Sequence, residues 1–175
     1  LGLPVTIEGT RQSCGVVSGI AELDRRDRRS FDFLLGKAVE EGDLTLTGGS
    51  SASGPTDAGG ARIGASNAVP APTNATITVE GDVTLTGGSM VNAGAVIGSG
   101  FLGGQPTNIT MDIGGNLTLG TGTADMSSAR IGSPSANIAG GDISIVVNGD
   151  VTLASSTVAG TRSVIRTLDS LMLDA

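Results

Sequence analysis

Few side chains in this sequence are suited to covalent or acid–base chemistry. The chain has no histidine and a single cysteine, Cys14. A cysteine nucleophile is usually activated by a neighbouring histidine base, so a cysteine–histidine pair is excluded. No Gly-Lys-Ser or Gly-Lys-Thr ending of a phosphate-binding loop follows the glycine-rich segments. We therefore predict that the protein is not an enzyme and carries no cofactor.

A regularly spaced series of carboxylate and amide side chains is the candidate for metal binding. Stacked oxygen ligands at a turn could hold calcium. Asx side chains also close turns by accepting hydrogen bonds from backbone amides, and the one Asn removes a charge without breaking the spacing. We therefore predict a structural turn ladder and no metal. Its members are the pairs Gly42-Asp43, Gly81-Asp82, Gly115-Asn116 and Gly149-Asp150.

Two arginines occupy equivalent places in this spacing. Arg62 and Arg130 each lie in an Ala-Arg-Ile-Gly block, whereas Val96 and Val164 hold the same position in the other two blocks. An outward-facing arginine pair could contact an acidic sugar, as in β-helical polysaccharide lyases. Such an enzyme also needs carboxylates or another base beside the arginine, and none is concentrated there. We predict solvated surface arginines, with ligand contact through Arg62 and Arg130 as the alternative.

Two other patterns carry weaker functional signals. Paired outward threonines in Thr45–Thr47 and Thr84–Thr86 resemble the flat arrays of β-solenoid ice-binding proteins, but the array stops after two coils. Threonine is also a common exposed strand residue. Asn74, Asn108 and Asn116 each begin an Asn-x-Thr glycosylation pattern, which chance produces readily in a chain rich in Asn and Thr. We assign neither ice binding nor glycosylation to the chain.

The regular spacing comes from an internal repeat of about 34 residues, a period typical of solenoid proteins. A Gly-Asx-aliphatic-Thr-Leu block recurs at Gly42, Gly81, Gly115 and Gly149, with spacings of 39, 34 and 34. A second block, marked by Ile97, Ile131 and Ile165, follows the last three of these glycines at one constant distance. In the first repeat this block comes five positions later. We place the insertion between Ser50 and Gly60.

Each repeat contains three short segments in which apolar and polar residues alternate, the period of a half-buried strand. Aliphatic residues recur at matching positions, so one coil is expected to stack on another, like over like. Neighbouring strands lie about 4.8 Å apart, which sets the advance per coil. The predicted stacked core consists of Val79, Val83, Leu85, Ile97, Ile113, Leu117, Leu119, Ile131, Val147, Val151, Leu153 and Ile165.

These patterns predict an all-β fold, a right-handed parallel β-helix with three short strands per coil. Connections between parallel strands are right-handed in nearly all cases. Coils start near residues 42, 81, 115 and 149, and the β-helix covers residues 42–175. Glycines at Gly48-Gly49 and Gly87-Gly88 are expected at the corners, where the chain needs positive φ.

The segment before Gly42 departs from the repeat. Val5–Gly9 matches Ile77–Gly81 and lies about one repeat before Gly42, which predicts a degenerate strand of the same kind. Ile20–Glu41 carries many charges and little glycine, and we expect a helix or an irregular cap there. A cap would protect the backbone edge of the solenoid from pairing with other chains. Residues 1–41 are therefore predicted to be an atypical first coil or capping segment.

The charge distribution argues against nucleic acid and membrane partners. The formal net charge is −7, and from Gly42 onward four arginines accompany ten carboxylates. Phosphate binding needs clustered positive charge. The basic segment Arg25–Arg29 is interrupted by Asp27 and preceded by Asp24, which favours an ion-paired exposed face. No stretch approaches the roughly 20 apolar residues that span a bilayer, so we expect no membrane insertion.

The repeat style resembles a known family. The run Gly81–Gly88, followed by an Ala-x-Ile-Gly block and an Ile-Thr-Val strand that returns to Gly-Asp, resembles the repeat arrays of filamentous haemagglutinin-like exoproteins of Gram-negative bacteria. The resemblance covers residues 42–175. It implies a parallel β-helix exported by two-partner secretion, displayed at the cell surface or released. It brings no catalytic residues with it.

The function implied by this resemblance is that of a structural and adhesive shaft segment in attachment or biofilm. The expected partners are further β-helix coils of the parent chain or copies of itself end to end, together with host or matrix glycans. Two alternatives remain open. One is a self-assembling extracellular filament subunit, and the other is a polysaccharide-binding or polysaccharide-cleaving β-helix.

Overall fold

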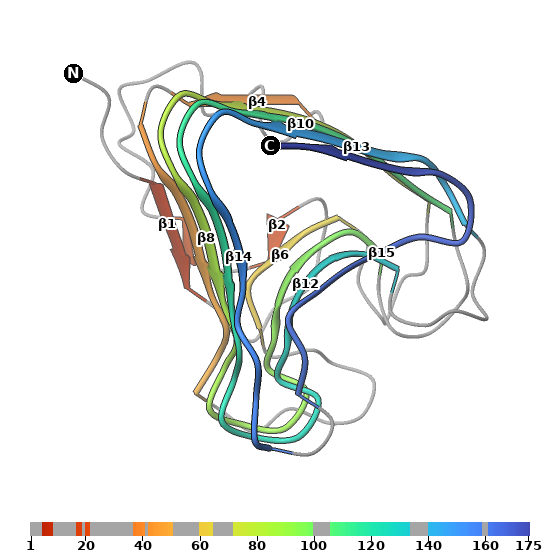
Figure 1. The fold of residues 1–175 in the computed structure, drawn as a ribbon. Helices are drawn as coiled ribbons and strands as arrows, with labels where there is room; N and C mark the ends of the chain where they lie inside the picture. The colour runs from red at the N-terminus through yellow and green to blue at the C-terminus, as the bar shows by residue number, and fades with distance from the viewer. Residues whose placement is uncertain are drawn as a thin grey trace.

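The computed structural model describes residues 5–8, 17–18, 20–21, 37–40, 42–50, 60–64, 72–99, 106–133, 140–158 and 161–175. All regular structure in these residues is β-strand, and they contain no helix. The strands form three sheets, A, B and C, in which strands from successive coils lie side by side (Figure 1).

The sheets contain six, five and five strands. Sheet A runs β14 (Val151–Leu153), β11 (Leu117–Gly120), β8 (Val83–Thr86), β5 (Leu44–Thr47), β1 (Val5–Glu8) and β3 (Ile20–Ala21). Sheet B runs β15 (Val164–Arg166), β12 (Ala129–Gly132), β9 (Ala95–Ile97), β6 (Arg62–Ile63) and β2 (Val17–Ser18). Sheet C runs β16 (Leu171–Asp174), β13 (Ile143–Val147), β10 (Thr107–Ile113), β7 (Thr73–Val79) and β4 (Lys37–Glu40).

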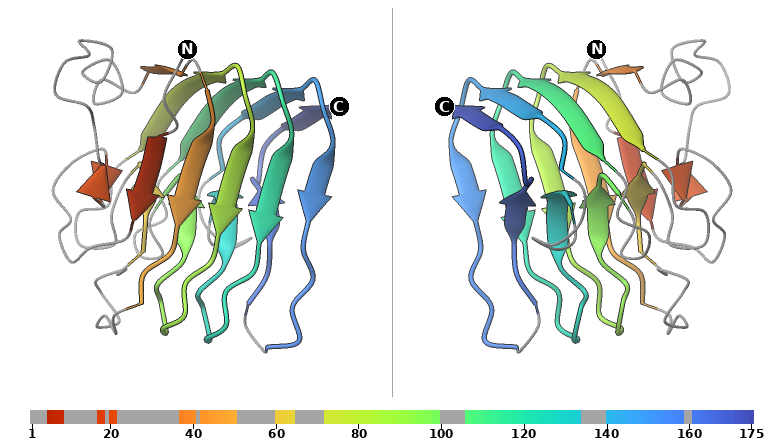
Figure 2. Two further views of the ribbon diagram at one scale, coloured as in Figure 1. Left: turned by 90° about the vertical axis from the view of Figure 1, so that its left-hand side faces the viewer. Right: turned by 90° about the vertical axis from the view of Figure 1, so that its right-hand side faces the viewer.

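Each coil contributes one strand to sheet C, then to sheet A, then to sheet B, and neighbouring coils pair in parallel. In Figure 1 the chain turns counter-clockwise as it advances towards the viewer and the C-terminus, which makes the coil right-handed. The side views show the strands of sheet A as parallel neighbours along the rod (Figure 2). The prediction of a parallel β-helix with three strands per coil is confirmed.

The pairing register follows the repeat. Leu117 pairs with Val83 in the preceding coil and with Val151 in the next, both at the spacing of 34. Leu44 pairs with Val83 at the longer spacing of 39, whereas Arg62 pairs with Val96 at the usual 34. The five extra residues of the first repeat therefore lie between β5 and β6. The predicted insertion at Ser50–Gly60 falls in this connection, and residues 51–59 of it lie outside the described residues.

The last coil is shorter than the others. Arg130 pairs with Val164 at the usual spacing of 34, but Ile143 pairs with Leu171 at a spacing of only 28. The connection from β15 to β16 is therefore six residues shorter than the connection from β12 to β13. The apolar run Leu171–Leu173 consequently occupies a regular place in sheet C.

The core is a set of aliphatic columns that run along the rod between the sheets. In β10 the residues alternate strictly between buried and exposed, and the buried ones stack on their equivalents in β7 and β13. Each fully buried aliphatic side chain contributes about 1.5–3 kcal/mol to folding relative to exposure. No single coil could cover its own apolar face, so the stability comes from stacking.

Most of the predicted stacked core is buried, and the exceptions lie in the last coil. Leu153 is 47% exposed, although Leu119, beneath it in the same column, is fully buried. Val151 and Ile165 are half-buried, because they too lie in edge strands of the last coil. The buried members are Val79, Val83, Leu85, Ile97, Ile113, Leu117, Leu119, Ile131 and Val147.

The strands before residue 42 are arranged differently from the prediction. Strand β1 pairs in parallel with β5 in sheet A, whereas β7, which contains the similar residues Ile77–Val79, lies in sheet C. The reason is that β4, immediately before Gly42, occupies the place in sheet C next to β7. Strand β3 lies antiparallel on β1, and β2 lies antiparallel on β6. Residues 22–36, where we expected a helix or irregular cap, lie outside the described residues.

The corner glycines are needed for close packing between coils. A Cβ atom on Gly48 would clash with the backbone of Gly88 in the next coil. None of the predicted corner glycines in the described residues has a positive φ, so that part of the prediction was wrong. Among the described glycines, positive φ occurs instead at the end of the sheet B strands, at Gly64, Gly98 and Gly132, and at Gly42 and Gly141.

Candidate functional site

The predicted turn ladder lies at the corner between sheets C and A, where it joins successive coils. The Oδ1 atoms of Asp43, Asp82 and Asn116 each accept a hydrogen bond from the backbone N–H of the equivalent residue in the next coil. The donor–acceptor distances are 2.8 Å from Asp82 to Asp43, 2.7 Å from Asn116 to Asp82 and 2.9 Å from Asp150 to Asn116. The side chains therefore satisfy amides at a corner, as Asx residues do in turns.

A metal role for this ladder has no support in its geometry. The Oδ1 atoms of Asp43, Asp82 and Asn116 already accept backbone hydrogen bonds. Within the described ranges, no group of three or more His, Cys, Asp or Glu side chains is placed to hold a metal ion. The ladder acts between coils, so each coil helps to set the register of the next.

Replacing Asn116 with aspartate is expected to lower the free energy of unfolding by about 2 kcal/mol at pH 7 and low salt, because two repulsions and one lost hydrogen bond add up. The new carboxylate would lie about 4.8 Å from Asp82 and from Asp150, and like charges at that distance repel by about 1 kcal/mol in water. It would also lose the hydrogen bond from Asn116 Nδ2 to Asp82 Oδ1. Urea unfolding with and without 1 M NaCl measures the effect.

Salt should reduce the Asn116→Asp loss, because it screens exposed charges. The matched control is Asn148→Asp, which adds the same charge at an exposed position whose neighbour in the preceding coil is Gly114. The control should show a smaller loss. A loss at Asn116 that does not respond to salt would contradict the repulsion argument.

A second ladder, which the sequence analysis missed, lies at the start of the sheet C strands. Asn108 Nδ2 donates to Asn74 Oδ1 at 2.8 Å, and the Asp142 N–H donates to Asn108 Oδ1 at 3.0 Å. Ser170 Oγ donates to Asp142 Oδ1 at 2.6 Å. The constant spacing of 34 between Asn74, Asn108 and Asp142 was the available signal. Two of these residues had been noticed only as glycosylation patterns.

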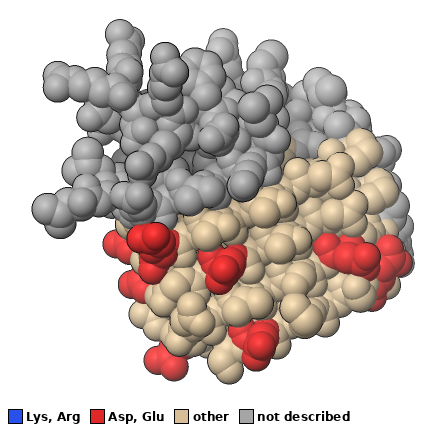
Figure 3. Space-filling view, turned by 90° about the horizontal axis from the view of Figure 1, so that it is seen from above, with Lys and Arg blue, Asp and Glu red and all other residues tan. Residues whose placement is uncertain are grey.

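The outer faces of sheets A and C carry hydroxyl and carboxylate side chains, whereas sheet B carries arginines. On sheet A, Thr45, Thr84, Thr118 and Thr152 form one in-register row. On sheet C, the exposed carboxylates include Asp112, Asp142 and Asp174. Seen from above, the only charged side chains visible on the described part of this face are acidic (Figure 3). The rod therefore presents a hydroxyl face and an acidic face.

Arg62 and Arg130 are not solvated surface residues. Their side chains are only 4% and 8% exposed, so this prediction was wrong. They lie in one column of sheet B, where Arg62, Val96, Arg130 and Val164 pair in turn. Every residue of β9 and β12 is buried. Sheet B is therefore covered on both faces, and alternation along its strands does not separate core from solvent.

Arg130 is held in an unfavourable electrostatic setting. Its Nη2 atom donates to the backbone oxygen of Ser99 at 2.7 Å, and among the described residues its Nε atom has no hydrogen-bond partner. Burial lowers the pKa of Arg130 to about 9, with the positive charges of Arg62 and Arg166 adding to the effect. Burial likewise lowers the pKa of Arg62 to about 10. Both side chains still carry a positive charge at neutral pH.

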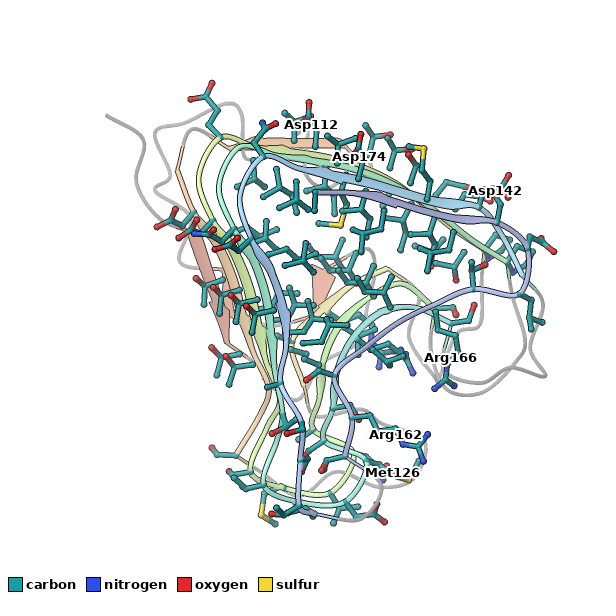
Figure 4. All side chains as sticks on the ribbon, in the orientation of Figure 1. Asp112, Met126, Asp142, Arg162, Arg166 and Asp174 are labelled. Carbon is teal, nitrogen blue, oxygen red and sulfur yellow. The ribbon has the colours of Figure 1, made fainter. Side chains whose placement is uncertain are left out.

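The other two arginines of the β-helix lie in or next to sheet B, as Arg62 and Arg130 do. Figure 4 shows Arg162 and Arg166 outside the stacked core, beside the chain that enters and leaves β15. The Arg162 N–H donates to Ser128 Oγ at 3.2 Å. Two buried hydroxyls just after β9 and β12, Ser99 Oγ and Ser133 Oγ, have no hydrogen-bond partner within the described ranges. Cationic and polar donors thus gather at sheet B.

The coil nearest the C-terminus exposes apolar side chains that continue the buried columns. Leu171 and Leu173 are 48% and 43% exposed, whereas their neighbours Ile143 and Ile145 in β13 are buried. Strands β14, β15 and β16 are the edge strands of their sheets at this end. This surface is referred to below as the terminal face.

Two predicted features cannot be placed. Cys14 and the basic segment Arg25–Arg29 lie outside the described residues. In the part of the chain that the structure describes, no helix is long and apolar enough to cross a membrane. No protein-family model, no curated protein and no solved structure matches this chain.

Proposed function

We propose that this chain is a structural shaft segment of a secreted or cell-surface bacterial exoprotein that works in attachment or biofilm. The observation that carries the proposal is the in-register stacking of coils at a constant spacing, each adding the same core columns and the same turn ladder. Such a stack gains about 4.8 Å of length per coil without any new kind of contact. This construction suits a spacer.

The chemistry of the outer faces agrees with a spacer role. Sheet A presents threonines and sheet C presents scattered carboxylates, and the described residues hold no group of three or more His, Cys, Asp or Glu side chains that could bind a metal ion. The repeat style resembles that of filamentous haemagglutinin-like exoproteins, and this likeness is the support for export by two-partner secretion. A single cysteine also suits a protein that folds after crossing a membrane.

The terminal face supports the proposed partner, a further coil with the same repeat pattern. Leu153, Leu171 and Leu173 lie one strand spacing beyond fully buried residues of the same columns. The Oδ1 atom of Asp150 occupies the ladder position that would accept the amide of a following coil. A coil stacked there would bury the apolar side chains and pair the three edge strands.

The same face also favours one alternative, a self-assembling filament subunit, in which the partner coil belongs to another copy. Negative-stain electron microscopy with light scattering on the same sample separates the two functions. Discrete particles a few nanometres long are expected for a shaft segment, because four to five coils span only about 20–24 Å. Long fibres of uniform width would overturn the shaft proposal and favour the filament.

A double variant keeps that test interpretable. Replacing Leu171 and Leu173 with aspartate places charges on the terminal face, where both side chains are about half exposed. If fibres form through this face, the variant should remain as small particles. Fibres that persist in the variant would exclude the terminal face as the assembly surface.

A further inference from the structure

The arginine cluster of sheet B, defined as Arg62, Arg130 and Arg166, concentrates positive charge inside a molecule of net charge −7. Arg62 and Arg130 lie two strand spacings apart in one column, and Arg166 lies in β15, next to β12. Parallel strands are about 4.8 Å apart, so the two column positions are separated by about 10 Å. Arg162 flanks the cluster just before β15.

The position of Arg130 does not need an arginine for packing. Val96 and Val164 occupy the same column one coil below and one coil above, and Val96 is only 7% exposed. An aliphatic side chain therefore fits this environment. A buried cation is costly unless it is paired and hydrogen-bonded, and like charges nearby add to the cost.

Three buried hydrogen-bonding groups on or just after strands β9 and β12 of sheet B have no partner among the described residues. Arg130 is more than nine-tenths buried, yet in the described part of the chain its Nε has no partner, and neither do the hydroxyls of Ser99 and Ser133. Arg62 and Arg166 each have an interaction of their own. Guanidinium groups have donors and no acceptors, and a hydroxyl can donate as well. A negatively charged group with several acceptor oxygens is the kind of ligand that suits the Arg130 guanidinium and these two hydroxyls.

We propose that the arginine cluster binds an oxyanion, with Arg130 as the central donor and the Ser99 and Ser133 hydroxyls as supporting donors. Arginine forks match the planar or tetrahedral oxygens of carboxylate, sulfate and phosphate groups, and such charge-assisted bonds are stronger than neutral ones. The rest of the molecule is acidic and repels anions over longer distances, so binding must depend on this local site. This inference goes beyond the shaft function and does not depend on it.

Inorganic sulfate is the first probe. Thermal unfolding and calorimetric titration with sodium sulfate, against sodium chloride at equal ionic strength, should show saturable binding to the unmodified chain. The Arg130→Val variant should fold, because valine occupies this column in two other coils. It should bind sulfate at least tenfold more weakly. Arg130→Lys keeps the charge but loses the fork and should lie between the two.

The control for net charge is Asn148→Asp, which makes the chain more negative by one unit, as Arg130→Val does, at an exposed corner. It should bind sulfate as the unmodified chain does. Sulfate stabilises many proteins by exclusion from their surfaces. A rise in melting temperature of equal size in the unmodified chain and in Arg130→Val would therefore overturn the proposal, as would the absence of saturable binding in the calorimeter.

A competition experiment identifies the source of the oxyanion. An oligosaccharide of galacturonic acid, which carries one carboxylate per sugar, is added to the sulfate-bound chain. If the oligosaccharide displaces sulfate from the unmodified chain, and Arg130→Val shows no such displacement, the result would support a site for acidic glycans. Saturable sulfate binding without displacement would support a site for the free ion.

Discussion

Replacing Leu119 with alanine is expected to lower the free energy of unfolding by about 3 kcal/mol. Leu119 is fully buried in β11, between Leu85 in one neighbouring coil and Leu153 in the other. Truncation removes transfer free energy and leaves a cavity that the coils on either side cannot close, because their backbones are held in register by the ladders of three sheets.

The matched control is the same substitution one coil later. Leu153 occupies the same column and the same sheet but is 47% exposed, so Leu153→Ala should cost less than about 1 kcal/mol. Urea unfolding followed by circular dichroism and by a second probe measures both losses and tests whether the coils unfold together. Equal losses at the two positions would show that stacking of one coil on another is not the source of core stability.

The register of the β-helix could be predicted because each repeat carries its own markers. The glycine that opens each block and the aliphatic residues behind it recur at fixed spacings, and the observed pairs Leu117–Val83 and Arg130–Val164 keep the same separation. The same periodicity would have found the Asn74, Asn108 and Asp142 ladder. The Asn-x-Thr pattern at Asn74 and Asn108 is local, so it does not by itself indicate that the two side chains stack on each other.

Departures from the repeat were harder to foresee. Val5–Gly9 matches Ile77–Gly81 in sequence, but β1 lies in sheet A and β7 in sheet C, because a short local match does not distinguish one sheet of a solenoid from another. The shortened connection before Leu171 left no marker, because a missing loop removes residues without changing the strands around it. In both cases the local pattern was correct, and its place in the coil depended on tertiary pairing.

The burial of Arg62 and Arg130 was missed for a different physical reason. In sheets A and C one face packs on the core and the other meets solvent, so the alternation of β10 gives the correct assignment. Sheet B is covered on both sides, and β12 is buried at every position. Alternation therefore wrongly predicts that Arg62 and Arg130, at outward positions of sheet B, are solvated. The sequence shows which residues share a face, but it does not show what covers that face.

The burial of Arg130 leads to a prediction about stability and pH. Replacing Arg130 with valine should raise the free energy of unfolding at pH 7 by about 1–4 kcal/mol, the range seen when apolar side chains replace buried ionic groups. The substitution removes a cation that is 8% exposed, has one unpartnered donor and is repelled by Arg62 and Arg166. The valines at positions 96 and 164 indicate that the new side chain fits.

The stabilisation should depend on pH in a defined direction. Burial holds the pKa of Arg130 at about 9 in the folded chain, well below its usual value, so above pH 9 the unfolded chain binds more protons than the folded chain. The contribution of Arg130 to the free energy of unfolding of the unmodified chain is therefore lowest below pH 9. It rises as the pH increases above 9. The advantage of Arg130→Val should be constant from pH 6 to 8 and should shrink from pH 9 to 11.

Urea unfolding of both chains at each pH, in chloride buffer without sulfate, measures this difference. Contributions from other titrating groups, including Arg62 with its pKa of about 10, are present in both chains and largely cancel. An advantage that stays constant to pH 11 would mean that Arg130 is not desolvated. A loss of stability in the variant at pH 7 would mean that Arg130 already has a counter-charge inside the folded chain, and the reason for expecting an external oxyanion would then disappear.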